Sequence, residues 1–233
     1  MNPTKRHAIV FLTYNKPALI DSRLDEVDRY LGHRDDFEVH VFDNGSNDYG
    51  VRLALISRSQ LMEYPLVIHR SEKNLGFGKG FNRAVKHIAA DKIVHLISDD
   101  VMITGDFITA HPLPWFVSEV RCHRLIAHGS GWNQFGDLII PYCDGYYVAM
   151  HMTAWERLGG FDERFYPYDY EDVDLGYRVT KDPTLFLVEE PSLPLRHQAA
   201  STIGYNDERF EHTVRMRVLF AAKWGLPNEP ERP

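Results

Sequence analysis

The sequence is poor in cysteine and in long apolar runs, and each shortage excludes a class of protein. Its 233 residues include two cysteines, Cys122 and Cys143, and neither belongs to a CxxC pair, so a zinc knuckle or a redox motif is not expected. No apolar run reaches the roughly 18 residues of a membrane-spanning helix, and the N-terminus lacks the apolar core of a signal peptide. We therefore expect a reduced, cytoplasmic protein without a transmembrane segment, a description that also fits an enzyme working at a membrane face.

The sequence also lacks a surplus of positive charge. Its 33 acidic residues outnumber the 26 basic ones, giving a formal net charge of -7. A general nucleic-acid binder carries a basic surplus or stripe, so a nucleic acid acceptor is not favoured. The acid excess suits a protein that binds an anionic ligand through a divalent metal held by carboxylates. The chain shows no repeat and no compositional break, which predicts a single domain over residues 1–233.

Apolar periodicity predicts that strands and helices alternate along the first half. The expected strands cover residues 8–13, 37–42, 66–69 and 93–97, and the expected helices cover 16–31, 51–61 and 79–90. Such alternation is typical of right-handed crossovers and a mainly parallel α/β sheet. Ligands bind at the carboxyl ends of the strands in open sheets of this kind, so the polar residues that follow each strand are candidate site residues.

The second half is less regular. We expect strands at 124–128, 145–151 and 185–188, and helices at 153–158, capped by Thr153, at 172–180 and at 207–224. The last helix ends at Gly225. Its apolar side chains are predicted to pack on the core, with a homodimer contact as the alternative. These side chains are Phe210, Val214, Val218, Leu219 and Ala222.

Polar and glycine-rich segments follow two of the expected strands. Ser98, Asp99 and Asp100 end the fourth strand, where paired carboxylates could bind Mg²⁺ or Mn²⁺, or could cap a local turn. Residues 74–83 follow the third strand and contain three glycines before a helix, which suits a phosphate group or a flexible turn. Phe81 replaces the third glycine of a GxGxxG fingerprint, and the spacing is also wrong for a P-loop.

Four acidic residues, Asp162, Glu171, Asp172 and Asp174, lie within thirteen positions among apolar and aromatic side chains. A carboxylate near aromatic walls can have a raised pKa and act as a general base. The alternative is a solvated helix start, where acids are common. Nearby rings are expected mostly in the core, although rings also suit sugar faces. They are Trp132, Tyr142, Tyr146, Tyr147, Trp155, Phe161, Phe165, Tyr166 and Tyr168.

Taken together, these segments resemble the family 2 glycosyltransferases with the GT-A fold, most closely the rhamnosyltransferase-like branch. The resemblance extends from about residue 6 to 201 and rests on six segments in the family's order: 11–15, 41–48, 74–82, 98–100, 159–163 and 171–175. It implies a GT-A (nucleotide-diphospho-sugar transferase) fold, a single Rossmann-like domain with a mainly parallel central sheet. It also implies a nucleotide-binding half at about 6–100, an acceptor and catalytic half at about 101–201, and a C-terminal helix at about 207–224.

The resemblance implies roles for individual residues. The base and ribose of the donor would be held by Thr13, Tyr14, Asp43 and Asn44, and the nucleotide or its phosphates would lie near Asn74, Gly76 and Lys79. Mn²⁺ or Mg²⁺ would be bound by Asp100 and His197, with Asp99 as a contributor. Asp172 matches the catalytic base, and Glu171 beside it would bind the acceptor or orient the base.

The implied reaction moves a sugar from a nucleotide-diphosphate donor, typically UDP or dTDP, to an acceptor hydroxyl, with inversion. The acceptor would be a glycan, a lipid-linked glycan or another hydroxyl compound. Ser98 stands where the family's DxD motif has its first acid, which leaves the metal preference open. Two alternatives remain: a sugar nucleotidyltransferase, whose glycine-rich loop after the first strand is missing here, and a catalytically inactive module that binds a sugar or a protein.

Overall fold

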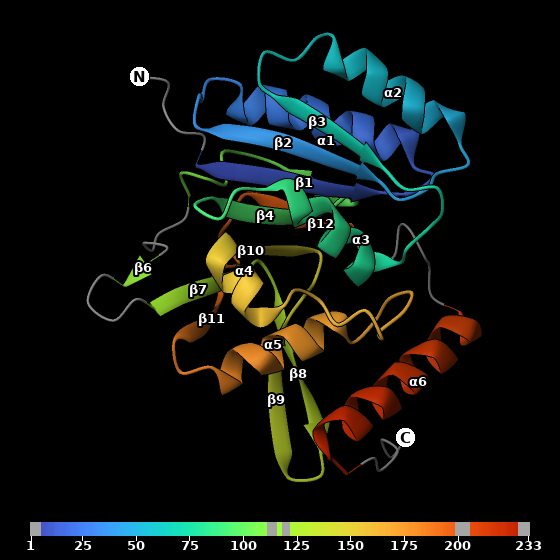
Figure 1. The fold of residues 1–233 in the computed structure, drawn as a ribbon, viewed down its shortest axis with the longest axis vertical. Coiled ribbons are helices and arrows are strands. Elements are labelled where there is room, and N and C mark those ends of the chain that lie inside the picture. Colours follow the sequence, from blue (N-terminus) through green and yellow to red (C-terminus); the bar gives the residue numbers. More distant parts are fainter. Residues whose placement is uncertain (1–5, 111–115, 118–121, 199–205, 228–233) are drawn as a thin grey trace.

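The centre of the molecule is a mixed β-sheet flanked by helices on both faces (Figure 1). The computed structural model describes residues 6–110, 116–117, 122–198 and 206–227. The sheet has the order β11-β7-β10-β4-β1-β2-β3, with β6 beside β7. Strands β1 to β4 are parallel, whereas β10 is antiparallel to β4 and β7. These strands are β1 (His7–Thr13), β2 (Phe37–Asp43), β3 (Leu66–Arg70), β4 (Ile93–Ser98), β6 (Phe116–Val117), β7 (Cys122–Ala127), β10 (Tyr147–His151) and β11 (Leu185–Glu189). The predicted α/β class with a mainly parallel sheet is confirmed.

Helices α1 (Pro17–Leu31) and α2 (Tyr49–Ser59) cover one face of the sheet. Residues Ile20, Leu24, Val27 and Leu31 form the buried stripe of α1, and their spacing of three or four positions places them on one side of a helix. They pack in one cluster with apolar residues of β1 and β2. Asp48 is the N-cap of α2, and its side chain accepts a hydrogen bond from the Gly50 N–H at 2.7 Å.

Helices α3 (Phe77–Ala84), α4 (Met152–Leu158) and α5 (Glu171–Lys181) pack in a second cluster on the opposite face of the sheet. The predicted helix at 79–90 begins two residues earlier, after Gly76, and ends in a short 3₁₀ turn, Val85–His87. The cap of α4 is His151, whose ring nitrogen accepts the Thr153 N–H at 3.3 Å. The prediction of Thr153 as the cap was therefore wrong, because the helix begins one residue before it.

A third cluster joins α5, the hairpin of β8 (Ser130–Phe135) and β9 (Leu138–Cys143), and α6 (Asp207–Trp224), as seen at the bottom of Figure 1. The bounds of α6 match the prediction, but its buried stripe does not. Phe210, Val214 and Val218 are exposed by 71%, 44% and 44%, whereas His212 and Phe220 are buried. The helix turns this second stripe toward α5, so the prediction that Phe210, Val214 and Val218 pack on the core was wrong.

Two small sheets were not predicted from the sequence. Strand β5 (Val101–Ile103) pairs with β12 (Leu195–His197), so residues more than ninety positions apart become neighbours. The β8–β9 hairpin was likewise missed. Across the described ranges, no helix is both long enough and apolar enough to cross a bilayer.

Candidate active site

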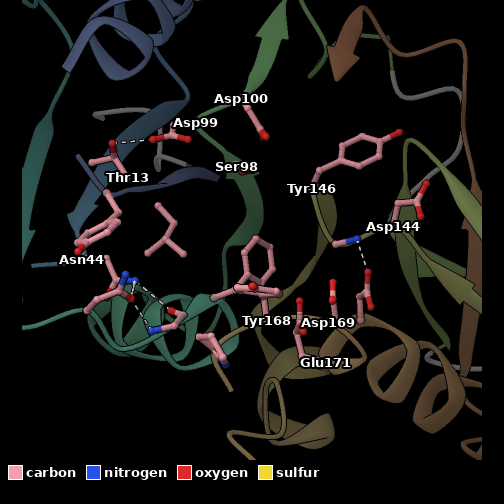
Figure 2. A pocket seen from close by; sticks show the side chains of 18 of the residues that line it. Thr13, Asn44, Ser98, Asp99, Asp100, Asp144, Tyr146, Tyr168, Asp169 and Glu171 are labelled. Atoms are coloured by element: carbon pink, nitrogen blue, oxygen red, sulfur yellow. Dashed lines mark hydrogen bonds between the residues drawn. The ribbon is translucent and has the colours of Figure 1, made fainter. Parts of the chain in front are cut away.

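The carboxyl ends of β1, β2 and β4 open into a cavity of about 750 Å³ (Figure 2). Asp100 points into it from the end of β4, and Glu171 points into it from the opposite side, at the start of α5. The cavity thus lies between the two halves of the chain. Most of the residues proposed from the sequence line it: Thr13, Tyr14, Asn44, Asn74, Gly76, Asp99, Asp100, Glu171, Asp172 and His197.

Asp100 and His197 form a pair on the wall near β4. His197 ends β12 and lies opposite Val101 in the β5–β12 ladder, which places its Nε2 3.6 Å from Asp100 Oδ2. The Tyr146 ring stacks on the His197 ring at 4.1 Å between centroids and an angle of 16°. The Tyr146 hydroxyl lies 2.8 Å from Nδ1 of His128, so the stacked ring is itself anchored.

The pair supplies two donors of the kinds that Mn²⁺ accepts. Within the described part of the chain, no group of three or more His, Cys, Asp or Glu side chains is arranged to hold a metal ion. Mg²⁺ and Mn²⁺ in nucleotide enzymes are usually bound by one or two carboxylates together with water and substrate phosphates. The donor set therefore fits an ion that a diphosphate helps to hold.

Asp99 faces away from this pair. Its Oδ2 accepts a hydrogen bond from the Thr13 hydroxyl at 2.7 Å. Burial raises the pKa of Asp99 to about 7, and the bond from Thr13 opposes this shift. The two residues join the ends of β1 and β4 at the cavity wall.

Asp172 is held by two backbone N–H groups. Its Oδ2 accepts from Gly145 at 3.0 Å and its Oδ1 accepts from Val173 at 2.8 Å. A Cβ on Gly145 would lie 3.1 Å from the Asp172 Cβ, so glycine allows this close approach. Burial raises the pKa of Asp172 to about 6, although the hydrogen bonds act to lower it. The carboxylate is therefore fixed in place and has an increased proton affinity.

Glu171 is more strongly perturbed. Its side chain is only 4% exposed, and within the described structure its Oε2 has no hydrogen-bond partner. Burial, assisted by the charge of Asp172, raises the pKa of Glu171 well above its ordinary value. A buried polar atom without a partner on the wall of a cavity is suited to a ligand hydroxyl.

Asn44 and Asn74 organise the glycine-rich turn. Asn44 Nδ2 donates to the Gly76 carbonyl at 3.0 Å and to Asn74 Oδ1 at 3.1 Å, and its Oδ1 accepts the Leu75 N–H at 2.9 Å. Asn74 Oδ1 also accepts the Gly76 N–H at 2.7 Å. These amides therefore fix the shape of the turn.

Four of the residues singled out in the sequence lie apart from the residues that line the cavity. Asp43 pairs with Arg70 and accepts the Ser46 N–H at 2.8 Å, and Lys79 pairs with Glu163 at 2.8 Å. Asp162 and Asp174 both contact Lys223 of α6. Only Glu171 and Asp172 of the four clustered acids belong to the cavity.

Several cavity residues were not proposed as site residues. They include Phe77, Asp144, Gly145, Tyr146, Pro167, Tyr168, Asp169 and Arg209. The aromatic and acidic run just before Glu171 was a usable signal for Tyr168 and Asp169. No signal pointed to Arg209, because it reaches the cavity only when α6 packs beside α5.

The strand order, the cavity at the strand ends and the helices on both faces define an α/β fold of the GT-A glycosyltransferase type. Residues 8–111, which supply the β1, β2 and β4 side of the cavity, match the family model of Glycosyl transferase family 2. The match covers slightly less than half of the chain. A comparison with curated proteins gives no significant match.

Solved glycosyltransferase structures share the fold. A mannosyltransferase from Pyrobaculum calidifontis, in complex with GDP-Man and Mn²⁺, has 18% identity and a TM-score of 0.66, over 99% of this chain and 66% of its own. S. aureus TarS 1–349 with UDP has 18% identity and a TM-score of 0.59, over 93% and 65%. GalNAc-T7 with UDP, GalNAc and Mn²⁺ has 12% identity and a TM-score of 0.64, over 94% and 49%. The chain thus spans between about half and two thirds of these proteins.

Proposed function

We propose that this protein is an inverting glycosyltransferase that moves a hexosyl or deoxyhexosyl group from a UDP- or dTDP-sugar to an acceptor hydroxyl. One observation carries the proposal: the partly buried Asp172 carboxylate shares a single cavity with the Asp100–His197 pair. A base and a cation-binding pair in one cavity are the two parts that direct displacement of a nucleoside diphosphate requires.

In the proposed reaction, Asp172 takes the proton of the acceptor hydroxyl. The hydroxyl oxygen then forms a bond to the anomeric carbon from the side opposite the diphosphate, whose bond to that carbon breaks, so the configuration inverts. The Gly145 and Val173 N–H groups keep the Asp172 carboxylate oriented during proton transfer. General base assistance of this kind contributes about 10²–10⁴ in rate.

Asp100 and His197 are the residues that would hold a divalent cation, Mn²⁺ or Mg²⁺. When bound, such an ion supplies positive charge that neutralises the departing diphosphate. We assign the nucleotide to Thr13, Tyr14, Asn74 and Gly76, which line the same cavity.

Glu171 is proposed to bind the acceptor. The residue lines the cavity, and its buried Oε2 has no partner in the described structure. The raised pKa of Glu171 favours a neutral carboxyl group that can both donate and accept hydrogen bonds. Such a group suits an acceptor with more than one hydroxyl, such as a glycan or a lipid-linked glycan.

The test is a panel of UDP- and dTDP-sugars with Mn²⁺ or Mg²⁺, in which donor binding is read by thermal shift and turnover by nucleotide release. Donor-dependent release of a nucleoside diphosphate is expected. Binding without release would instead indicate the non-catalytic module, and release of pyrophosphate from a nucleoside triphosphate and a sugar phosphate would indicate a nucleotidyltransferase.

The Asp172→Asn variant tests the base in the same assay. We expect kcat to fall by about 10²–10⁴, because the amide cannot accept the proton, while the affinity for UDP with Mn²⁺ stays within about twofold. Asp137→Asn, at the exposed tip of the β8–β9 hairpin, is the matched control. A near wild-type kcat for Asp172→Asn would remove this residue from the role.

A further inference from the structure

Two consecutive residues just before Glu171 adopt a backbone conformation that side chains disfavour. Asp169 and Tyr170 have φ values of +68° and +69°. Residues with a Cβ persist in the left-handed region only where their surroundings hold them there. Tyr170 is also the N-cap of α5, so this conformation sets the direction in which Glu171 and Asp172 enter the cavity.

The N-terminal half of α6 contacts this segment at three points. His212 Nε2 lies 2.7 Å from the Tyr168 carbonyl oxygen. The Thr213 hydroxyl donates to Asp169 Oδ2 at 2.6 Å, and Arg209 Nη2 lies 3.6 Å from Asp169 Oδ1. His212 and Thr213 lie three and four positions after Arg209, so the three side chains share one face of the helix.

The segment is also held on its other side. The Phe77 N–H at the start of α3 donates to the Pro167 carbonyl at 2.7 Å. On the α6 side, the Tyr170 side chain is buried beside Phe220, and the Tyr170 hydroxyl accepts a hydrogen bond from Arg217 Nη1 at 3.3 Å. Residues 167–170 are therefore fixed between α3 and α6.

We propose that α6 is a positioning element for catalysis: through its contacts with Tyr168 and Asp169, made by His212 and Thr213, it holds Asp169 and Tyr170 in the left-handed conformation that aims Asp172 at the acceptor hydroxyl. This inference rests on the glycosyltransferase function proposed above. Thr213 does not line the cavity, so it acts through Asp169 and not on the substrate. The helix lies outside residues 8–111, the part that matches the family model.

The test compares Thr213→Val, which removes the hydroxyl at nearly constant volume, with Thr213→Ser, which restores it. We expect Thr213→Val to lower kcat by about 10- to 100-fold, because small displacements of a catalytic group have effects of that size. The affinity for UDP with Mn²⁺ should stay within about twofold, and Thr213→Ser should recover most of the rate. The matched control is Thr180→Val, which loses a hydroxyl bonded to the Tyr177 carbonyl within α5.

Wild-type kcat in a folded Thr213→Val protein would overturn the inference, and so would an equal loss in Thr180→Val. If Thr213→Val does not fold, His212→Leu removes the contact with the Tyr168 carbonyl and is judged by the same measurements. If the wild-type chain transfers no sugar, the proposed function fails separately. Hydrogen exchange then tests separately whether α6 holds the segment before Glu171. The amides of residues 169–172 should exchange faster in Thr213→Val than in the wild-type chain, and unchanged exchange would contradict the inference.

Discussion

At the scale of single residues, burial and partners separate acids that look alike in the sequence. Asp162 and Asp174 are compensated by Lys223, with Arg164 and Arg178 as second partners, and their role is structural. Among the residues that the structure describes, no cation forms an ion pair with Glu171 or Asp172, and burial raises the pKa of both. A carboxylate that has a raised pKa and no counter-ion has an increased proton affinity, so it is available to accept a proton in catalysis.

The raised pKa of Asp172 predicts an acid limb in the pH–rate profile. Because the base works only when ionised, kcat/KM should fall about tenfold per pH unit below pH ~6 and level off above pH ~7. The measurement is kcat/KM between about pH 5 and 8 in constant ionic strength. A profile that stays flat down to pH ~5 would contradict this assignment.

The same shift has a consequence for stability. The pKa of Asp172 is higher in the folded chain, about 6, than its ordinary value of 3.8, so the folded state binds more protons between these values. The free energy of unfolding therefore decreases as pH rises from about 4 to 6, by at most roughly 3 kcal/mol. Asp172→Asn should lack this decrease and be the more stable protein at neutral pH.

At the scale of elements, the contact between the Gly76 turn and residue Pro167 joins the two sides of the cavity. Gly76 has φ +78° and ψ -179°, a combination that is essentially restricted to glycine. A Cβ at this position would lie 2.7 Å from the Pro167 carbonyl oxygen. Any side chain at position 76 would therefore push the Gly76 turn away from Pro167 and the residues that lead to Glu171.

We predict that Gly76→Ala lowers the free energy of unfolding by about 3 kcal/mol or more and weakens UDP binding. Gly159→Ala is the comparison, because Gly159 also has φ +78° but no heavy atom within 4 Å of its added Cβ. That variant should lose about 1–2 kcal/mol and keep its affinity for UDP. Urea denaturation and titration with UDP give both values, and equal effects of the two variants would argue against a close contact.

Lys223 ties α6 to α5 through a largely buried ion pair. Its Nζ contacts Asp162 at 2.8 Å and the fully buried Asp174. We predict that Lys223→Met lowers the free energy of unfolding by about 2–4 kcal/mol, because it leaves buried carboxylates under-compensated. Adding Asp174→Asn to this variant should recover part of the loss, which denaturant titration of the three proteins can measure.

At the scale of the whole molecule, the cavity is bounded by residues from β1 to α6. A ligand in it binds the folded state only, so it should raise the melting temperature. We predict that UDP with Mn²⁺ raises the Tm of the wild-type chain more than UDP alone. Asp100→Ala should lose this Mn²⁺-dependent part and keep the rest, as read by differential scanning fluorimetry. An unchanged Mn²⁺-dependent shift would separate Asp100 from metal binding.

Prediction from sequence succeeded where the signal is local. The apolar runs of β1, β2 and β4 and the stripe of α1 reveal their period within a few residues. It failed for β5 and β12, which are three residues long and, within the described ranges, form a two-stranded sheet of their own. It also failed for the buried face of α6, because a helix with apolar residues on more than one side can pack on the core through any of those sides.

The sequence by itself determined the α/β class, the order of the main elements and four of the acids that line the cavity, Asp99, Asp100, Glu171 and Asp172, because apolar periodicity and turn chemistry act between near neighbours. The tertiary structure alone decided which acids are neutralised by Lys223, that β5 pairs with β12, and that α6 contacts the segment before Glu171. Those outcomes depend on contacts between residues from roughly 40 to nearly 100 positions apart, and the geometry of such contacts is set by packing of the whole chain.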